Sequence, residues 1–430
     1  MPFTELQNEL NERAAQGLLR QRRTLDSPQS PHIVVDGKPY LSFCSNDYLG
    51  LANHPLPVAA LQRGAAQWGV GAGAAHLVSG HFEPHHRLEQ ELAAFVRKPA
   101  ALLFSTGYMA NLGAVQALAG KGDTVFADKL NHASLNDAML LSRAGVKRYR
   151  HNDMEQLAAL LEQTRSGRKL VITDAVFSMD GDLAPLPELL ALCEQHDAWL
   201  LVDDAHGFGV LGGQGRGSLF NFKPKSPPAP LFQRGELTGA QFLTPPLQRG
   251  GHVDAHVDNP PLKKGGRGDL HSSRIIYMAT LGKAVGVFGA FVAAEQVVID
   301  TLVNQARSYV YTTATSPALA CAVSASLQLI EQGDALREHL RELIVQLRSG
   351  VADLPWDLMP SDTAIQPLLI GDNRAALALS DALRERGIWV AAIRPPTVPP
   401  GTARLRITLS AAHSAGDVAQ LIEALHELAR

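Results

Sequence analysis

The feature that most constrains the fold of this chain is the alternation of short apolar runs with longer helical patterns between about residues 84 and 295. The apolar runs at 101–105, 124–127, 169–177, 198–204, 274–280 and 289–294 have the length and composition of strands. Helical patterns such as EPHHRLEQELAAFV and MEQLAALLEQ lie among them. Runs that are apolar along their whole length suit strands that are covered on both faces. We therefore predict an α/β protein in which helices flank a mostly parallel sheet.

The rest of the chain predicts two further parts. Beyond residue 295, helical patterns precede the apolar runs IQPLLIG and ARLRITLS and a last helix, which predicts a smaller α/β domain over 296–430 after a large domain over 51–295. The first 23 residues mix acids and bases at helical spacing and have no apolar centre like that of a signal peptide. We expect an exposed helix and an arm over residues 1–50.

One segment, about 222–271, breaks this pattern. It has almost no periodic apolar signal, and SPPAPLFQRG, TPPLQRGG and NPPLKKGG are imperfect copies of one another. Such a composition buries too little apolar surface to offset the entropy of ordering it. We predict a surface loop inserted between two strands, and a proline-rich docking site for a partner is the alternative interpretation.

Composition excludes several classes of function. The net charge of −3 gives no electrostatic reason to expect nucleic acid or an acidic membrane as a partner. No apolar run reaches the roughly 20 residues that span a bilayer. The cysteines Cys44, Cys193 and Cys321 lie far apart, which argues against a disulfide framework and against a metal site. We expect a cytoplasmic protein without metal, nucleic acid or membrane partners.

The stretch LLVDDAHGFG places polar residues directly after an apolar run. In an open α/β sheet, ligands bind at the carboxyl ends of the strands. Asp203 and His206 are therefore candidate site residues. If the alternation of the strand continues, Asp204 points to the other face, and we assign it no catalytic role.

The stretch LFSTGYMAN, 103–111, predicts a strand that leads through a short turn into a helix. This arrangement aims free backbone N–H groups and the positive end of the helix at an anion such as phosphate. An ordinary helix N-cap is the alternative interpretation. The glycine-rich stretch 69–81 follows a helical run and not a strand, so it is a weak dinucleotide candidate.

Lys283, in ATLGKAVGVFG, follows a later apolar run. Desolvation lowers the pKa of a lysine and makes its amine a nucleophile that can form a Schiff base, although a solvated turn is the alternative when the lysine is taken alone. Together with an acid, a histidine and a phosphate-type turn, this amine completes the set of groups that pyridoxal phosphate requires.

These motifs resemble those of the α-oxoamine synthases, pyridoxal 5'-phosphate enzymes of fold type I, along nearly the whole chain. The resemblance is carried by SNDYLG (45–50), HLVSGH (76–81), STGYMAN (105–111), NHASL (131–135), VFSMDGD (176–182), VDDAHGFGVLG (202–212), GRGS (215–218), TLGKA (280–284) and AIRPPTVPPGTARLRITLSAAH (392–413). The last of these looks most like the branch of the family that serves biotin synthesis. The resemblance implies a large cofactor-binding domain and a small C-terminal domain.

The resemblance also implies roles for individual residues. Lys283 would be the Schiff-base lysine, Asp203 the partner of the pyridine nitrogen, and His132 the residue that stacks on the cofactor ring. The remaining implied contacts are to the phenolic oxygen (His206, Ser178), to the cofactor near its phosphate (Gly107, Tyr108, Thr280) and to substrate (Arg394, Arg20, Thr397 and again His132). Taken alone, His132 and Ser178 could be helix caps and Arg394 could be a solvated side chain.

The implied reaction is a decarboxylative Claisen condensation of L-alanine with an acyl thioester, pimeloyl-CoA or its carrier-protein equivalent, in a homodimer with sites at the subunit interface. Two alternatives stay open. A glycine-using relative, such as 2-amino-3-ketobutyrate CoA ligase, would share the lysine and aspartate motifs. A non-catalytic scaffold would keep the fold and use the 222–271 segment to dock partners.

Overall fold

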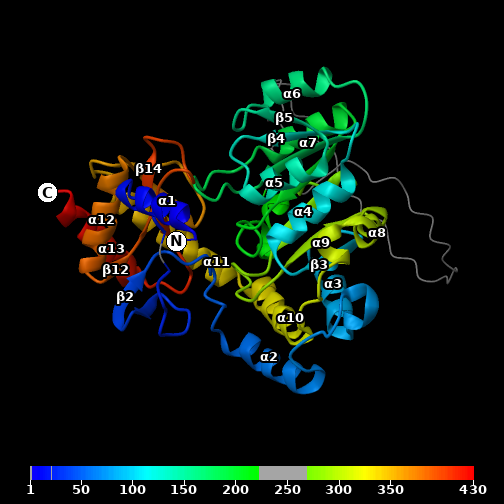
Figure 1. The fold of residues 1–430 in the computed structure, drawn as a ribbon. Coiled ribbons are helices and arrows are strands. Elements are labelled where there is room, and N and C mark those ends of the chain that lie inside the picture. Colours follow the sequence, from blue (N-terminus) through cyan, green and yellow to red (C-terminus); the bar gives the residue numbers. More distant parts are fainter. Residues whose placement is uncertain (1, 21, 222–268) are drawn as a thin grey trace, which may run out of the picture.

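The computed structural model describes residues 2–20, 22–221 and 269–430, and Figure 1 shows a larger body and a smaller one. The predicted insertion, 222–271, lies outside the described residues except for its last three positions. Leu219, which precedes the insertion, and Leu270, one of its last three positions, are joined, because the backbone N–H of Leu270 donates to the carbonyl oxygen of Leu219 at 2.9 Å. Arg97 and Asp269 form an ion pair of 2.7 Å next to this point.

A seven-stranded sheet forms the centre of the larger body, with the strand order β3-β9-β8-β7-β6-β4-β5. All of its neighbouring pairs are parallel except those of β9, which runs antiparallel to β3 and β8. The predicted mostly parallel sheet is confirmed. The strands are β3 (Ala100–Phe104), β4 (Thr124–Asp128), β5 (Gly145–Tyr149), β6 (Lys169–Asp174), β7 (Trp199–Asp203), β8 (Ile275–Thr280) and β9 (Ala290–Ala294).

Two details differ from the sequence prediction. The run 169–177 is a strand only to Asp174, because the chain then turns and Val176 bridges to Leu183. The strand β5 was not predicted, since GVKRY lies at the sheet edge and buries only its last residue, so it lacks an apolar run.

Helices cover both faces of this sheet. One apolar core packs α4, α5, α8 and α9 against residues such as Ile172, Leu201 and Met278, and the other packs α3, α6, α7 and α10 against the alternate strand residues. This alternation is the expected consequence of strand geometry. The helices are α2 (Pro55–Trp68), α3 (Glu83–Phe95), α4 (Gly107–Leu118), α5 (Ala133–Ser142), α6 (Met154–Glu162), α7 (Leu186–Gln195), α8 (Gln296–Gln305), α9 (Arg307–Val310) and α10 (Pro317–Gln332).

The smaller body contains a four-stranded antiparallel sheet in the order β10-β11-β14-β13. The predicted runs IQPLLIG and ARLRITLS form its two longest strands. Its elements are α11 (Asp334–Gly350), β10 (Asp357–Leu358), β11 (Ile365–Gly371), α12 (Asn373–Glu385), β12 (Ile388–Trp389), β13 (Ala391–Ile393), β14 (Ala403–Thr408) and α13 (Ala415–Leu428).

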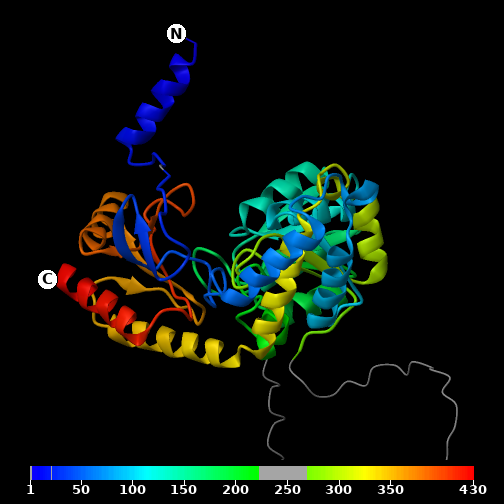
Figure 2. The same ribbon diagram turned by 90° about the horizontal axis from the view of Figure 1, so that it is seen from below.

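The N-terminal arm adds strands to the smaller body. Its hairpin, β1 (His32–Val35) and β2 (Lys38–Ser42), forms a three-stranded sheet with β12, in which Leu41 pairs with Ile388. Helix α1 (Thr4–Ala15) buries no residue and stands off the rest of the molecule in Figure 2, so the expected exposed helix is confirmed. No described helix has the length and apolar character needed to cross a membrane. The domain boundaries at 50 and 295 stay a prediction.

Candidate functional site

Two of the predicted residues lie at the carboxyl ends of adjacent parallel strands. Asp203 ends β7, and Lys283 follows β8, which pairs with β7. The Lys283 amine donates to the Thr280 hydroxyl at 3.3 Å. Burial lowers the pKa of Lys283, while the carboxylates of Asp203 and Asp174 oppose that change. The fold thus brings an amine and an acid to the edge of the sheet that the carboxyl ends of its parallel strands form, which is called the sheet edge from here on.

Asp203 is buried and receives hydrogen bonds from two sides. The side-chain amide of Asn111 donates to its Oδ2 at 2.7 Å, and the backbone N–H of Ala205 donates to its Oδ1 at 3.0 Å. Sequence reasoning did not single out Asn111, although the residue belongs to the STGYMAN motif. A signal was available, because an asparagine on the apolar face of a helix needs a buried partner.

His206 is hydrogen-bonded to a tyrosine from the N-terminal arm. Its Nδ1 lies 2.6 Å from the Tyr48 hydroxyl. Burial, with the nearby charges of Lys283 and Arg406, lowers the pKa of His206 well below its ordinary value, so the ring is neutral at physiological pH. Burial raises the pKa of Tyr48 to about 12. Neither Tyr48 nor Arg406 was predicted, since both reach the site from segments distant in sequence.

Ser178 lies in the loop after β6 and is fixed through its backbone. Its carbonyl oxygen accepts from Nε of Arg406 at 2.7 Å, and the same guanidinium donates to Asn46 at 3.2 Å. The Ser178 residue also lines a cleft of about 400 Å³ together with Phe177, Thr397 and other residues from both bodies. The cleft therefore connects a predicted cofactor contact with a predicted substrate contact.

The predicted phosphate turn begins helix α4. The helix starts at Gly107, and the Thr106 hydroxyl accepts from the backbone N–H of Met109 at 3.2 Å, so the ordinary N-cap exists here as well. A Cβ on Gly107 would lie 2.6 Å from the Thr280 methyl group, so this position has no room for a side chain. The Tyr108 ring is exposed at the start of the helix and its hydroxyl donates to Asp137.

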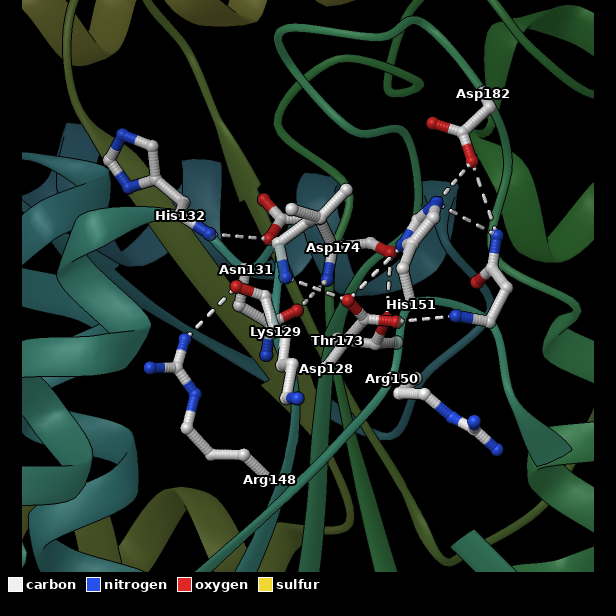
Figure 3. Close-up of polar contacts among 12 residues, drawn as sticks. Asp128, Lys129, Asn131, His132, Arg148, Arg150, His151, Thr173, Asp174 and Asp182 are labelled. Atoms are coloured by element: carbon white, nitrogen blue, oxygen red, sulfur yellow. Dashed lines mark hydrogen bonds and ion pairs between the residues drawn. The ribbon is translucent and has the colours of Figure 1, made fainter. Parts of the chain in front are cut away.

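His132 caps α5, as the alternative interpretation of this residue foresaw. Its Nδ1 accepts from the backbone N–H of Ser134 at 3.2 Å, and its own backbone N–H donates to Asp174 at 2.7 Å. Figure 3 shows this backbone contact and the imidazole ring turned away from Asp174. The ring is thus presented at the sheet edge while the backbone anchors it to β6.

A closed ionic network lies beside this edge (Figure 3). The His151 ring bridges Asp128 at 3.1 Å and Asp182 at 2.7 Å. Burial alone would lower the pKa of His151, but the hydrogen bonds to both carboxylates outweigh burial and raise the pKa to about 10. The Asn152 backbone N–H donates to Asp128 as well, at 2.8 Å. This network ties together the loops that follow β4, β5 and β6.

Three of the predicted substrate residues, Arg20, Arg394 and Thr397, gather where the N-terminal segment meets the smaller body, whereas the fourth, His132, lies at the start of α5. The Arg20 guanidinium donates to the Thr397 hydroxyl at 3.1 Å, and Arg394 donates to the carbonyl oxygen of Gly17. Arg394 Nε is buried and has no partner among the described residues. These contacts join positions 377 residues apart, so only folding brings them together.

A group of histidines also gathers near the start of α3. His76, His81 and His85 bring ring nitrogens within 4.8 Å of one another. In His85, however, Nδ1 accepts from the backbone N–H of Phe82 at 3.1 Å, and Nε2 lies 3.0 Å from the carbonyl oxygen of Thr315. Both nitrogens of His85 are therefore already used, which argues against this set as a metal site.

The residues at the sheet edge fit pyridoxal phosphate. Gly107 starts helix α4 at a position with no room for a side chain, and the amine of Lys283 lies close enough to the buried acid Asp203 to feel its charge. An anion-binding helix start, an amine for an aldehyde and a carboxylate for a ring nitrogen are the donor set that this cofactor needs.

Comparison with known proteins defines the class. A family model described as aminotransferase class I and II matches residues 38–425, and the chain belongs to this family. The fold is fold type I of pyridoxal phosphate enzymes. A structure of serine palmitoyltransferase from Sphingomonas wittichii superposes with a TM-score of 0.82 at 28% identity, covering 99% of this chain and 96% of that one.

The chain is similar along its whole length to a particular enzyme. It is 56% identical to 8-amino-7-oxononanoate synthase of Nitrosospira multiformis over 99% of this chain and 96% of that protein. It is 54% identical to that of Nitrosomonas europaea over 100% of both. A structure of the Francisella tularensis enzyme superposes with a TM-score of 0.69 at 27% identity, over 90% of this chain and 97% of that one.

Proposed function

We propose that the chain catalyses the decarboxylative condensation of L-alanine with a pimeloyl thioester, which yields 8-amino-7-oxononanoate in biotin biosynthesis. One observation supports this proposal most strongly: the Lys283 amine and the buried Asp203 carboxylate lie near the ends of adjacent strands, close enough for the carboxylate to affect the amine's pKa, in a chain 56% identical to an enzyme of that name. The acyl donor is pimeloyl-CoA or its carrier-protein equivalent.

Pyridoxal phosphate is the cofactor. It would be held by Lys283 at its aldehyde, by Asp203 at its ring nitrogen and by the α4 start near its phosphate, with further contacts from Tyr108, His132, Ser178, His206 and Thr280. When bound, the cofactor acts as an electron sink for the bond-breaking and bond-forming steps at the α-carbon of the amino acid.

The side chains of the protein supply proton transfer and binding. Burial lowers the pKa of Lys283, so a larger share of its amine is unprotonated and able to take a proton from the substrate α-carbon. His206 stays neutral and offers a ring nitrogen, with the other held by Tyr48. Arg394 binds the amino-acid carboxylate, because a guanidinium can donate two parallel hydrogen bonds to a carboxylate. Thr397, which lines the cleft, and Arg20, which donates to it, contact the substrate.

The protein acts as a homodimer in the cytoplasm. Several large apolar side chains of the described single chain are exposed, among them Val70, Val78, Leu140 and Tyr311, and a second copy would cover such a surface. All of the cysteines are free thiols, as a reducing compartment favours.

Side-by-side turnover tests the choice of substrate. We expect the purified protein to use L-alanine with pimeloyl-CoA at least tenfold faster than glycine with acetyl-CoA. The reverse preference would favour a glycine-using relative. A preparation that stays colourless after addition of pyridoxal phosphate, and that borohydride does not label on Lys283, would favour the non-catalytic scaffold.

A further inference from the structure

We propose that Asn111 and Ser134 form a positioning pair that fixes Asp203 and His132, the two residues that would contact the cofactor ring, as one unit. The inference rests on the proposed function, because it concerns the same site. It assigns a role to two buried residues that the mechanism above does not use.

A continuous chain of hydrogen bonds joins the four residues. The Nδ2 amide of Asn111 donates one hydrogen to Asp203 Oδ2 at 2.7 Å and the other to the Ser134 hydroxyl oxygen at 2.9 Å. The Ser134 hydroxyl lies 2.7 Å from Nδ1 of His132. Asn111 and Ser134 are both fully buried, so water does not compete for these bonds.

The backbone fixes the direction of this chain. The backbone N–H of Ser134 donates to Nδ1 of His132 at 3.2 Å, so Nδ1 carries no proton. The Ser134 hydroxyl therefore donates its hydrogen to Nδ1 and accepts from Asn111. A neutral His132 then carries its proton on Nε2, the nitrogen on the far side of the ring. The Asn111 amide thus fixes the position of the carboxylate, and the Ser134 hydroxyl adds a second bond to the imidazole tautomer that the Ser134 backbone N–H selects.

The choice of asparagine argues against a role in packing alone. The Oδ1 atom of Asn111 is buried and has no hydrogen-bond partner among the described residues. Leaving such an acceptor unpaired costs about 1–3 kcal/mol, so an apolar residue would suit a merely structural position better. An aspartate there would place another carboxylate against Asp203. The site needs a neutral group that donates in two directions, and the asparagine amide meets that need.

The two branches of the chain can be broken separately. Asn111→Ala removes the amide that donates to Asp203 and to the Ser134 hydroxyl, and the isosteric Asn111→Asp keeps the shape but replaces a donor by an acceptor. Ser134→Ala breaks only the His132 branch, and Ser134→Thr restores the hydroxyl. Asn136→Ala, in helix α5 next to the site, is the matched control, since its amide donates to the carbonyl oxygen of Asn131 and not to Asp203.

The test measures the holoenzyme by cofactor dissociation constant, pH titration of the visible absorption band of the bound cofactor, and steady-state kinetics. We expect Asn111→Ala and Asn111→Asp to shift the pH midpoint of the band and to lower kcat by about 10- to 100-fold, with KM for alanine changed less than threefold. Ser134→Ala should lower kcat by a smaller factor, about three- to tenfold, and Ser134→Thr should restore it.

Other outcomes overturn the inference. If a folded Asn111→Asp keeps the band titration and cofactor affinity of the wild type, the amide serves packing only. If Ser134→Thr behaves like Ser134→Ala, the hydroxyl carries no role. A wild type that binds the cofactor but does not convert alanine defeats the proposed substrate while the band titration still tests the pair. A wild type that binds no cofactor defeats both proposals.

Discussion

Asp203 and Asp204 are consecutive and both buried, yet they lie in opposite surroundings. Asp204 accepts from the Ser218 hydroxyl at 2.6 Å, from the Ser218 backbone N–H at 2.7 Å and from the Tyr277 hydroxyl at 2.7 Å. Asp203 shares its oxygens between Asn111 and the backbone of Ala205. Asp203 also lies close enough to Lys283 to affect the pKa of that amine.

The difference distinguishes Asp204, an acid that stabilises the fold, from Asp203, an acid that we expect to take part in the reaction. The donors around Asp204 come from Ser218, the last residue of GRGS, and from Tyr277 in β8, so this carboxylate holds the GRGS segment against the strand that leads to Lys283. The face of Asp203 is shared with the ionisable amine of Lys283 and with the phosphate-type turn. Strand alternation sends the two side chains to opposite faces, and the partners on each face decide the role.

The largest effect on turnover is expected from Lys283→Ala, which changes the face of the sheet on which Asp203 lies. Loss of the amine removes both the covalent hold on the cofactor and the base, so turnover should fall by about 10⁴-fold or more. The unfolding midpoint of the apoprotein should change little or rise, because a partly desolvated amine is removed. Initial rates, borohydride labelling and thermal unfolding check this prediction. Wild-type turnover in the variant would remove Lys283 from the mechanism.

The next effect contrasts Asp203→Asn with Asp204→Asn. We expect Asp203→Asn to fold normally and to lose about 10²- to 10⁴-fold in kcat, because the ring nitrogen of the cofactor loses its anionic partner. Asp204→Asn should retain kcat per folded molecule within about threefold, but lose about 1–3 kcal/mol of stability through mismatched donors. Urea unfolding and kinetics on both variants decide. Equal losses of kcat would end the distinction between the two acids.

The smallest effect concerns pH. Burial raises the pKa of Asp204 from 3.8 to about 6, so the folded state binds a proton that the unfolded state has already released above pH 5. Stability should therefore fall as the pH rises through 6, by about 1 kcal/mol between pH 5 and pH 7 relative to Asp204→Asn. Urea unfolding at both pH values measures it, with the exposed Asp300→Asn as a control that follows the wild type. An identical pH dependence in Asp204→Asn would contradict the buried, protonatable state of this acid.

The predictable part of the fold follows from burial. Strands β3, β4, β6, β7, β8 and β9 are buried and therefore apolar along most of their length, which makes them visible in the sequence. The edge strand β5 carries polar residues, and strands such as β10, β12 and β13 have only two or three residues, so neither kind forms an apolar run that the sequence reveals. Pairing of β2 with β12 joins segments about 350 residues apart, and no local pattern encodes such a contact.

The site residues also divide into those that the local sequence predicts and those that it does not. The positions of Asp203, Lys283 and the turn at Gly107 could be predicted because each lies at the end of a strand or a few residues after it. In α/β proteins, ligands bind at these strand ends. Tyr48 could not be assigned to His206, since 158 residues separate them. The roles of the predicted residues in cofactor and substrate binding stay predictions that the variants above test.

The sequence by itself determined which residues are apolar, where strands end and which ionisable groups stand at those ends, because these are local properties of the chain. Only the tertiary structure decided which buried group faces which. It formed the hydrogen bond from Asn111 to Asp203 and the one from Arg20 to Thr397. It also brought the hydroxyl groups of Ser218 and Tyr277 to Asp204. Hydrogen bonds act over about 3 Å, so their partners exist only after distant segments have packed together.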